Sequence, residues 1–349
     1  MARTGRIAVT VSEVLAEIPR LSVLVVGDVC LDRWCRYEPR FAEPSRETGL
    51  RRIAVVEVER TPGGGGTVAS NLAALGAGKV AVLGAVGDDG HAAELREALL
   101  GRGIVTELIV DEGRLTFCYT KLLNRTTGIE DLSRVDFVSE RALPPEIERQ
   151  VLERFQELAP RFDVVIVSDQ MEQGAGGTVT AGLREVLAGF ALAYPEKVVW
   201  GDSRVRAEDF RHVLMKLNED EANQASSRIG RRGDYDGLRL HIGHEYMIVT
   251  SGAAGALVVT AAGEIAVPGR KVDNPLDLCG AGDSFNAGAA MAFRICGDLV
   301  QATRFGNLVA SITITKQGTG TASASELLAV ARGEGEAEEC NASRQSGHD

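Results

Sequence analysis

The chain is poor in aromatic residues, has no long apolar run and carries no excess of positive charge. Phe, Trp and Tyr make up 5% of its 349 residues, and 38 Lys and Arg face 49 Asp and Glu, for a formal net charge of −11. An acidic chain lacks the basic face that general binding to nucleic acid phosphates requires. The longest apolar runs, such as Val164–Val167 and Ala256–Val259, are far shorter than a membrane span. Neither nucleic acid nor a membrane is therefore an expected partner.

Cysteine is present, but not in the spacing of a metal site or a redox pair. The six cysteines lie at positions 30, 35, 118, 279, 296 and 340. None of them forms the C-x-x-C pattern of a zinc site or a thioredoxin-like motif. Residues 1–10 do not have the pattern of a secretory leader. We therefore expect reduced thiols and a cytoplasmic protein.

Short apolar strands alternating with helical segments make up most of the chain. Val23–Val26, Val80–Leu83 and Val164–Val167 are continuous apolar runs, and Ala92–Leu100 follows one of them with helical periodicity. Strands that are apolar on both faces and separated by helices indicate a mostly parallel sheet with helices on both sides. The predicted fold is a doubly wound α/β domain over residues 1–332.

Three other segments alternate between apolar and polar residues. They are Ile53–Glu59, Phe117–Leu123 and Val135–Val138, and alternation is typical of strands with one exposed face. We expect a small β-sheet lid, formed from about 33–60 and 106–138. Because exposed strand edges invite pairing, a homodimer through the lid is also expected.

Two polar stretches have no periodic pattern. Residues 333–349 are rich in Glu, Gly, Ala and Ser, and this composition predicts a disordered acidic tail. Residues 226–243 interrupt the α/β pattern with several arginines and glycines. No structure is predicted for this second stretch.

The strongest chemical motif is the run Gly280-Ala281-Gly282-Asp283, followed by a helical segment. Small residues let a ligand approach the backbone, and the free N–H groups of a first helical turn attract anions. A carboxylate in that turn suits a general base. Asp is also a favoured helix N-cap, so both interpretations of Asp283 are open from these residues alone.

A second glycine cluster lies in the first quarter of the chain, where four consecutive glycines (63–66) precede Thr67 and Asn71. It can be a flexible turn, or a surface for a polyhydroxylated ligand with Asn71 supplying amide hydrogen bonds. Its spacing matches neither G-x-G-x-x-G nor the P-loop. A nicotinamide site and a Walker-type site are therefore excluded.

These two motifs resemble the two signatures of the ribokinase-like (PfkB) carbohydrate kinases. The first is Gly63-Gly64 with Asn71, and the second runs from Asp277 to Asp283. The resemblance covers most of residues 21–331, with its motifs in the family's order. It implies a ribokinase-like fold and an ATP-dependent sugar kinase that uses Mg²⁺ and, as in many relatives, a monovalent cation such as K⁺.

The resemblance also implies roles for individual residues. Asp283 would be the catalytic base, Gly280, Ala281 and Gly282 the anion hole, and Asp277 a ligand of the monovalent cation. The implied sugar-binding residues are Asp32, Gly63, Gly64, Thr67, Asn71 and Arg134. The implied nucleotide-binding residues are Asn218, Glu221, Thr250, Gly252, Gly255 and Asn307, with Glu221 in the second shell of Mg²⁺.

Within the family, 134–137 and 168–169 most resemble the kinases of D-glycero-D-manno-heptose 7-phosphate. Three positions depart from that pattern. Thr67 stands where the heptose enzymes have an asparagine, Leu278 where the second signature has a threonine, and Glu172 where the heptose enzymes have a lysine. Lys121, Arg125 and Arg134 lie in or near the lid and are either substrate-phosphate contacts or solvated charges. The low aromatic content favours a sugar over a nucleoside.

The acceptor therefore stays open among a sugar phosphate, a free sugar, and a nucleoside or other small alcohol. A non-catalytic sensor of sugar or nucleotide is the alternative of a different class. Loss of Asp283 or of the glycines would favour that reading, and both are present.

Overall fold

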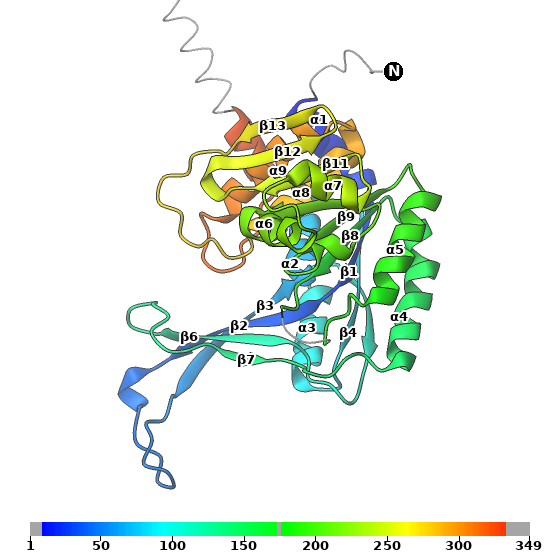
Figure 1. Cartoon of the computed structure of the whole chain (residues 1–349). Coiled ribbons are helices and arrows are strands. Elements are labelled where there is room, and N and C mark those ends of the chain that lie inside the picture. The colour runs from blue at the N-terminus through cyan, green and yellow to red at the C-terminus, as the bar shows by residue number, and fades with distance from the viewer. Residues whose placement is uncertain (1–8, 173–175, 333–349) are drawn as a thin grey trace, which may run out of the picture.

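The computed structural model describes residues 9–172 and 176–332, so the expected tail at 333–349 lies outside the described residues. In this part of the chain the main feature is a nine-stranded sheet (Figure 1). Its strands in spatial order are β13 (Gly263–Pro268), β12 (Gly255–Thr260), β11 (Tyr246–Thr250), β10 (Leu214–Asn218), β9 (Val198–Ser203), β8 (Val164–Asp169), β1 (Ser22–Gly27), β4 (Lys79–Val86) and β5 (Val105–Val110). Neighbours from β11 to β5 pair in parallel, and β12 and β13 are antiparallel additions. The predicted mostly parallel sheet is confirmed.

Helices cover both faces of this sheet, because its strands bury side chains on both. In β1, Val23 and Val25 belong to one hydrophobic core, and Leu24 and Val26 belong to the other. The first core includes residues of α1 (Val11–Glu17), α2 (Gly65–Ala74), α3 (Gly90–Leu100), α8 (Ala281–Cys296) and α9 (Leu299–Thr313). The second includes residues of α4 (Pro145–Leu158), α5 (Ala181–Ala193), α6 (Glu219–Arg228) and α7 (Tyr235–Ile242).

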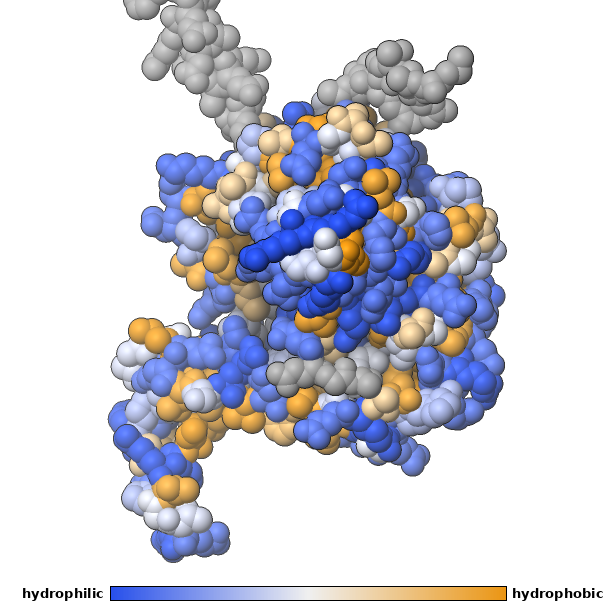
Figure 2. All heavy atoms as spheres, in the orientation of Figure 1, coloured by the Kyte–Doolittle hydropathy of each residue, from blue (hydrophilic) through white to orange (hydrophobic). Residues whose placement is uncertain are grey.

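A small four-stranded sheet projects from one side of this body (Figure 1). Its strand order is β3 (Val55–Gly64), β2 (Val29–Tyr37), β6 (Cys118–Asn124) and β7 (Val135–Phe137). The segment that joins β2 to β3 extends farthest from the body, and the space-filling view shows hydrophobic residues along this projection (Figure 2).

One expected boundary of the lid differs from the structure. Residues 105–110 form β5, which pairs with β4 in the large sheet, so 106–110 are not part of the small sheet. As the edge strand, β5 is only partly buried, and its exposure pattern therefore imitates that of a lid strand.

The unassigned stretch 226–243 contains the end of α6 and the whole of α7. Asp234 caps α7 by accepting the N–H of Gly237 at 2.7 Å, and Gly243 ends that helix in the left-handed conformation. In the described part of the chain, no helix has the length and apolarity needed to cross a membrane.

Candidate active site

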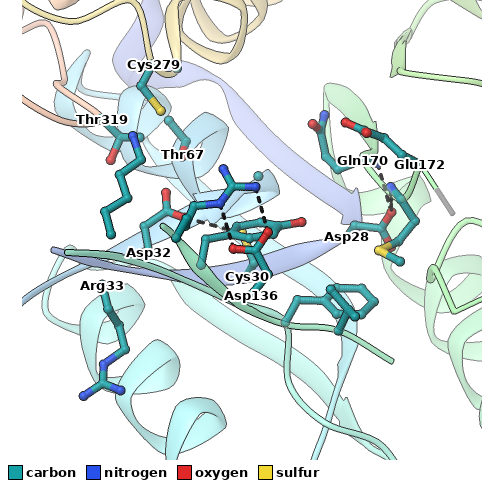
Figure 3. Close-up of a pocket in the computed structure, with 18 of the residues that line it drawn as sticks. Asp28, Cys30, Asp32, Arg33, Thr67, Asp136, Gln170, Glu172, Cys279 and Thr319 are labelled. Carbon is teal, nitrogen blue, oxygen red and sulfur yellow. Dashed lines mark hydrogen bonds and ion pairs between the residues drawn. The ribbon is translucent and has the colours of Figure 1, made fainter. Parts of the chain in front are cut away.

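A cavity of about 710 Å³ lies between the small sheet and the main body (Figure 3). Asp32 and Lys121 reach it from the small sheet, Thr67 from the first glycine motif, and Gly280 and Asp283 from the second. A Cβ at Gly280 would stand 3.2 Å from Cγ2 of Thr67. Two motifs more than 200 residues apart in the sequence therefore meet at one site.

The second motif begins α8 as its composition predicts. Gly280 is the N-cap residue, with φ = 77°, and Asp283 is the third residue of the helix. Asp283 is therefore not the N-cap, and no side-chain hydrogen bond caps this helix. Ala281 donates its N–H to Leu278 at 3.2 Å, while the N–H groups of Gly282 and Asp283 have no acceptor among the described residues. Such free N–H groups at a helix start form an anion site.

Two of the carboxylates that line the cavity, those of Asp283 and Asp32, hold their protons more tightly than ordinary aspartates. Burial, and next the carboxylate of Asp202, raise the pKa of Asp283 to about 7, although Lys216 and Arg204 oppose the shift. Burial likewise raises the pKa of Asp32 to about 6, against the lowering effect of Lys121 and Arg134. A base with a pKa near neutrality can both accept and release a proton at working pH.

The glycines of the first motif allow Asp32 to lie against the backbone. A Cβ at Gly63 would stand 2.7 Å from both carboxylate oxygens of Asp32 and 2.5 Å from Sγ of Cys30. Gly64 has φ = 56° and itself lines the cavity. Thr67 donates its hydroxyl to Pro62 O at 3.1 Å. Any larger residue at 63 would displace the Asp32 side chain.

Asn71 does not line this cavity. Its side chain is fully buried, with Nδ2 donating to Thr67 O at 3.1 Å and Oδ1 accepting the N–H of Ala322 at 3.4 Å. These contacts fasten α2 to the C-terminal part of the chain, so its amide is occupied by backbone.

Lys216 lies at the anion turn, although the sequence analysis missed it. Its Nζ lies 3.2 Å from Oδ2 of Asp202 and would be 3.1 Å from a Cβ at Gly282. Burial lowers the pKa of Lys216, but the carboxylate of Asp202 raises it above its ordinary value, so the lysine stays charged. The available signal was a lysine between buried apolar residues of β10, where Leu214, Met215 and Leu217 surround it in the sequence.

The expected nucleotide residues form a strip outside the cavity, along the ends of β10, β11 and β12. Asn218 is the register partner of Thr250, and Gly255 is the register partner of Pro268. Asn307 donates Nδ2 to Pro268 O at 3.2 Å. The Gly252 and Gly255 turn is tight, because a Cβ at Gly255 would stand 2.2 Å from backbone atoms of the 267–269 segment.

Asn218 and Glu221 form a reciprocal capping box at the start of α6. Oδ1 of Asn218 accepts the Glu221 N–H at 2.9 Å, and Glu221 Oε2 accepts the Asn218 N–H at 2.7 Å. Burial, and next the carboxylate of Asp202, raise the pKa of Glu221. The motif therefore forms the start of α6. It also brings the Glu221 carboxylate near the charges of Asp202 and Lys216.

Asp277 joins two loops. Its Oδ1 accepts the N–H of Cys279 at 2.9 Å, and its Oδ2 accepts the N–H of Gly318 at 3.1 Å. In the described residues no group of three His, Cys, Asp or Glu side chains could hold a metal ion.

The cations of the small sheet differ in their partners. Arg134 makes two contacts of 2.7 Å with Asp136, and Arg125 lies 3.6 Å from Glu38. Lys121 instead lies 4.2 Å from the centroid of the Trp34 ring. In the part of the chain that the structure describes, no carboxylate lies within ion-pair distance of Lys121. Its charge is available to a ligand.

A glycine-opened turn with free N–H groups beside a half-buried carboxylate lies at the carboxyl ends of the parallel strands, where α/β proteins bind their ligands and where an anionic group can be held. Residues 20–197 and 200–326 match the pfkB family carbohydrate kinase model, so the chain belongs to that family. It is accordingly a carbohydrate kinase, a phosphotransferase that uses ATP and has an alcohol group as acceptor.

The chain is also similar to individual proteins. The bifunctional protein HldE of Pelobacter propionicus is 28% identical over 343 residues, which cover 91% of this chain and 65% of that protein. The chain thus spans about two thirds of the length of that relative. Ribokinase from Thermotoga maritima has a TM-score of 0.64 with 22% identity, over 88% of this chain and 98% of the other. Phosphofructokinase-2 from Escherichia coli has a TM-score of 0.67 with 19% identity, over 89% and 98%. These two structures share the fold.

Proposed function

We propose that the protein transfers the γ-phosphate of ATP to a hydroxyl group of a sugar bound between Asp32 and Asp283. The observation that supports this most directly is the shared cavity of Asp32, Asp283 and the Gly280 turn. The acceptor hydroxyl gives its proton to the Asp283 carboxylate as its oxygen forms the new bond to phosphorus. The bond between that phosphorus and ADP breaks, and ADP leaves.

The chain would stabilise the charge that develops on the transferred phosphoryl group. The N–H groups of Gly282 and Asp283 and the ammonium group of Lys216 converge at the start of α8. Fixed donors aimed at developing charge are the main source of catalysis in phosphoryl transfer. We assign Lys216 to this role together with the expected anion hole.

The acceptor that fits best is a sugar that already carries a phosphate, of the heptose phosphate kind. Lys121 lines the cavity without a carboxylate partner among the described residues, so it is the cation best suited to a substrate phosphate. A nucleoside fits less well. A nucleoside base would stack on an aromatic ring, but each of the three rings that line the cavity already has a cation over it. Lys121 lies over Trp34, Arg134 over Tyr119, and Arg114 over Phe117.

Mg²⁺ would bind mainly through ATP phosphates and water, with the Glu221 carboxylate in its second shell. It would neutralise phosphate charge. Asp277 would be the carboxylate ligand of K⁺. It lies between the two loops whose Cys279 and Gly318 N–H groups it accepts. The Escherichia coli phosphofructokinase-2 structure is described as a complex with potassium.

A second copy of the chain would cover the apolar side chains of the small sheet. Five large apolar side chains in and after the β2–β3 connection are between 41% and 72% exposed: Phe41, Leu50, Ile53, Val55 and Val56. Exposed apolar patches mark interaction surfaces, and we propose a homodimer through this part.

The proposed function is tested by measuring ADP release from ATP with Mg²⁺ across free sugars, sugar phosphates, heptose 7-phosphate and nucleosides. Asp283→Asn is expected to lower turnover by about 10²–10⁴ while ATP still binds, because the general base is lost. Asp298→Asn is the matched control, because Asp298 caps α9 outside the cavity and Asn is an equally good cap. Turnover of Asp283→Asn near that of the wild type would overturn the base assignment. Silence across the panel, with ATP bound, would favour a sensor.

A further inference from the structure

A buried carboxylate with no assigned role lines the cavity of the candidate active site. Asp28 follows β1 and is only 3% exposed. Its Oδ2 accepts the N–H groups of Gln170 at 2.9 Å and Met171 at 3.1 Å (Figure 3). Its Oδ1 accepts the N–H of Thr178 at 2.6 Å. One side chain thus binds the backbone on both sides of the connection between β8 and α5.

The backbone of Asp28 makes two further contacts. Its N–H donates to Ser168 O at 2.8 Å, and its carbonyl accepts the N–H of Gly65 at 2.9 Å. Asp28 therefore joins three parts of the site: the end of β8, the glycine motif before α2, and the segment that follows Asp169. Two of the three supply residues to the cavity: Gly64 from the glycine motif, and Gln170, Met171 and Glu172 from the segment after Asp169.

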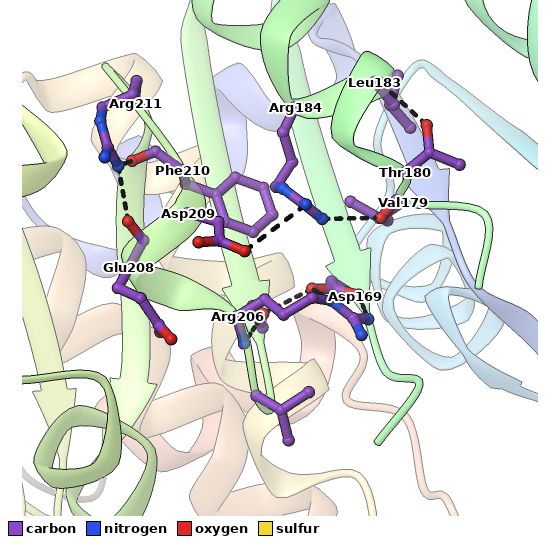
Figure 4. Close-up of polar contacts among 12 residues, drawn as sticks. Asp169, Val179, Thr180, Leu183, Arg184, Arg206, Glu208, Asp209, Phe210 and Arg211 are labelled. Atoms are coloured by element: carbon purple, nitrogen blue, oxygen red, sulfur yellow. Dashed lines mark hydrogen bonds and ion pairs between the residues drawn. The ribbon is translucent and has the colours of Figure 1, made fainter. Parts of the chain in front are cut away.

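Two arginines, one buried and one partly exposed, bind carbonyl groups of the same connection. Arg206 pairs with Asp169 and donates to Met171 O at 3.0 Å (Figure 4). Arg114 is 6% exposed and donates to Gly176 O. The N–H groups of this connection are thus bound by the Asp28 carboxylate, and two of its carbonyl groups are bound by arginines. Burying charges costs free energy, and Nε and Nη1 of Arg114 have no hydrogen-bond partner among the described residues. We therefore take these contacts as favouring a specific position of this backbone and not as a gain in stability.

The segment braced in this way forms a wall of the cavity. Gln170, Met171 and Glu172 all line it, and Glu172 pairs with Arg204 at 2.6 Å. We infer that Asp28 is a positioning residue for the acceptor: its carboxylate sets the distance between the glycine motif and the Gln170–Glu172 wall, and so determines which acceptor is bound. The inference deepens the proposed function and rests on it for the identity of the acceptor.

The direct test is Asp28→Asn, which keeps the shape but turns one acceptor atom into a donor facing an N–H group. Hydrogen exchange of the peptides containing Gln170, Met171 and Thr178 is expected to accelerate by about tenfold to a hundredfold. This is the size of effect that corresponds to losing one or two charge-assisted hydrogen bonds. The KM of the best acceptor in the ADP-release panel is expected to rise about tenfold. The KM of ATP is expected to stay within about twofold, because the expected nucleotide-binding residues lie along the ends of β10, β11 and β12, outside the cavity.

Two further variants separate positioning from stability. Gly177→Ala keeps the carboxylate but adds a Cβ 3.2 Å from both of its oxygens, and a smaller change in the same direction is expected. It also serves if Asp28→Asn does not fold. Asp163→Asn is the matched control, because Asp163 accepts the N–H of Ser22 at 2.9 Å at the opposite end of β1. It should lower stability and leave the acceptor KM unchanged.

If hydrogen exchange at Gln170, Met171 and Thr178 were the same as in the wild type in both Asp28→Asn and Gly177→Ala, the inference would be overturned. An equal rise in the KM values of ATP and acceptor, which indicates general loosening, would also overturn it. A panel without any active acceptor would count against the proposed function, while the exchange rates, which need no turnover, would still decide whether Asp28 braces the wall.

Discussion

Lys216 lies beside Gly282, with Nζ 3.1 Å from the position that a Cβ at residue 282 would occupy. A strand of the main sheet thus brings a buried ammonium group to the first turn of α8, where the free N–H groups point. We expect Lys216→Met to lower kcat by roughly 10²–10³, the effect of removing one donor to developing charge. Lys197→Met is the control, because Lys197 donates to Phe162 O away from the cavity. Steady-state kinetics decide, and an unchanged kcat would remove Lys216 from the site.

The activity should rise with pH around neutrality. A base works in its ionised form, and the pKa of Asp283 is raised to about 7 by burial and by Asp202. Below that pH the group is protonated and inactive, so kcat/KM should increase about tenfold per pH unit below pH 7 and level off above it. The profile between about pH 5 and 9 measures this. A flat profile between about pH 6 and 8 would contradict the assignment.

Lys121 is expected to distinguish phosphorylated from unphosphorylated acceptors. Lys121→Met removes the cavity cation that lacks a carboxylate partner in the described residues. The KM of a sugar phosphate should then rise about tenfold to a hundredfold, the strength of a charge-assisted contact. The KM of a free sugar should change little. Lys271→Met is the control, because Lys271 is exposed and pairs with Asp273. Equal changes for both acceptors would show that Lys121 does not bind the phosphate.

The proposed dimer can be disrupted without touching the strands. Leu50→Lys and Ile53→Lys change two exposed residues of the β2–β3 connection. Placing charges in an apolar interface should convert a dimer into a monomer, as measured by light scattering. Leu192→Lys changes an apolar residue of α5 that is 63% exposed and should leave the mass unchanged. A wild-type chain that is already monomeric at high concentration would contradict the proposal.

The sequence predicted the regular parts of the molecule because those patterns are local. Val23–Val26 and Val164–Val167 are apolar on both faces, and each lies in a parallel strand between two cores. The wrong lid boundary at 106–110 has a physical cause: β5 is an edge strand and is only partly buried, as the strands of the small sheet are. The motif at Gly280–Asp283 was located with its helix because small residues and a following helix are visible in the letters.

Asp28, Lys216 and Asn71 required the fold, because their roles depend on groups far along the chain. Asp28 follows an apolar strand and is bound by residues 170 and 178. Lys216 meets a helix that starts at residue 281. Asn71 was expected at the sugar, but its amide is occupied by Thr67 and Ala322. No spacing in the sequence encodes these partners.

The amino-acid sequence by itself determined the α/β class, the anion turn and the presence of Asp283, since backbone preference and side-chain type act over short distances. Tertiary structure alone decided which charges are buried together, which cavity cation has no carboxylate partner among the described residues, and how Asp28 joins three segments. The reason is that burial and neighbouring charges set the pKa and the hydrogen bonds of a group, and both arise only when distant segments pack against each other.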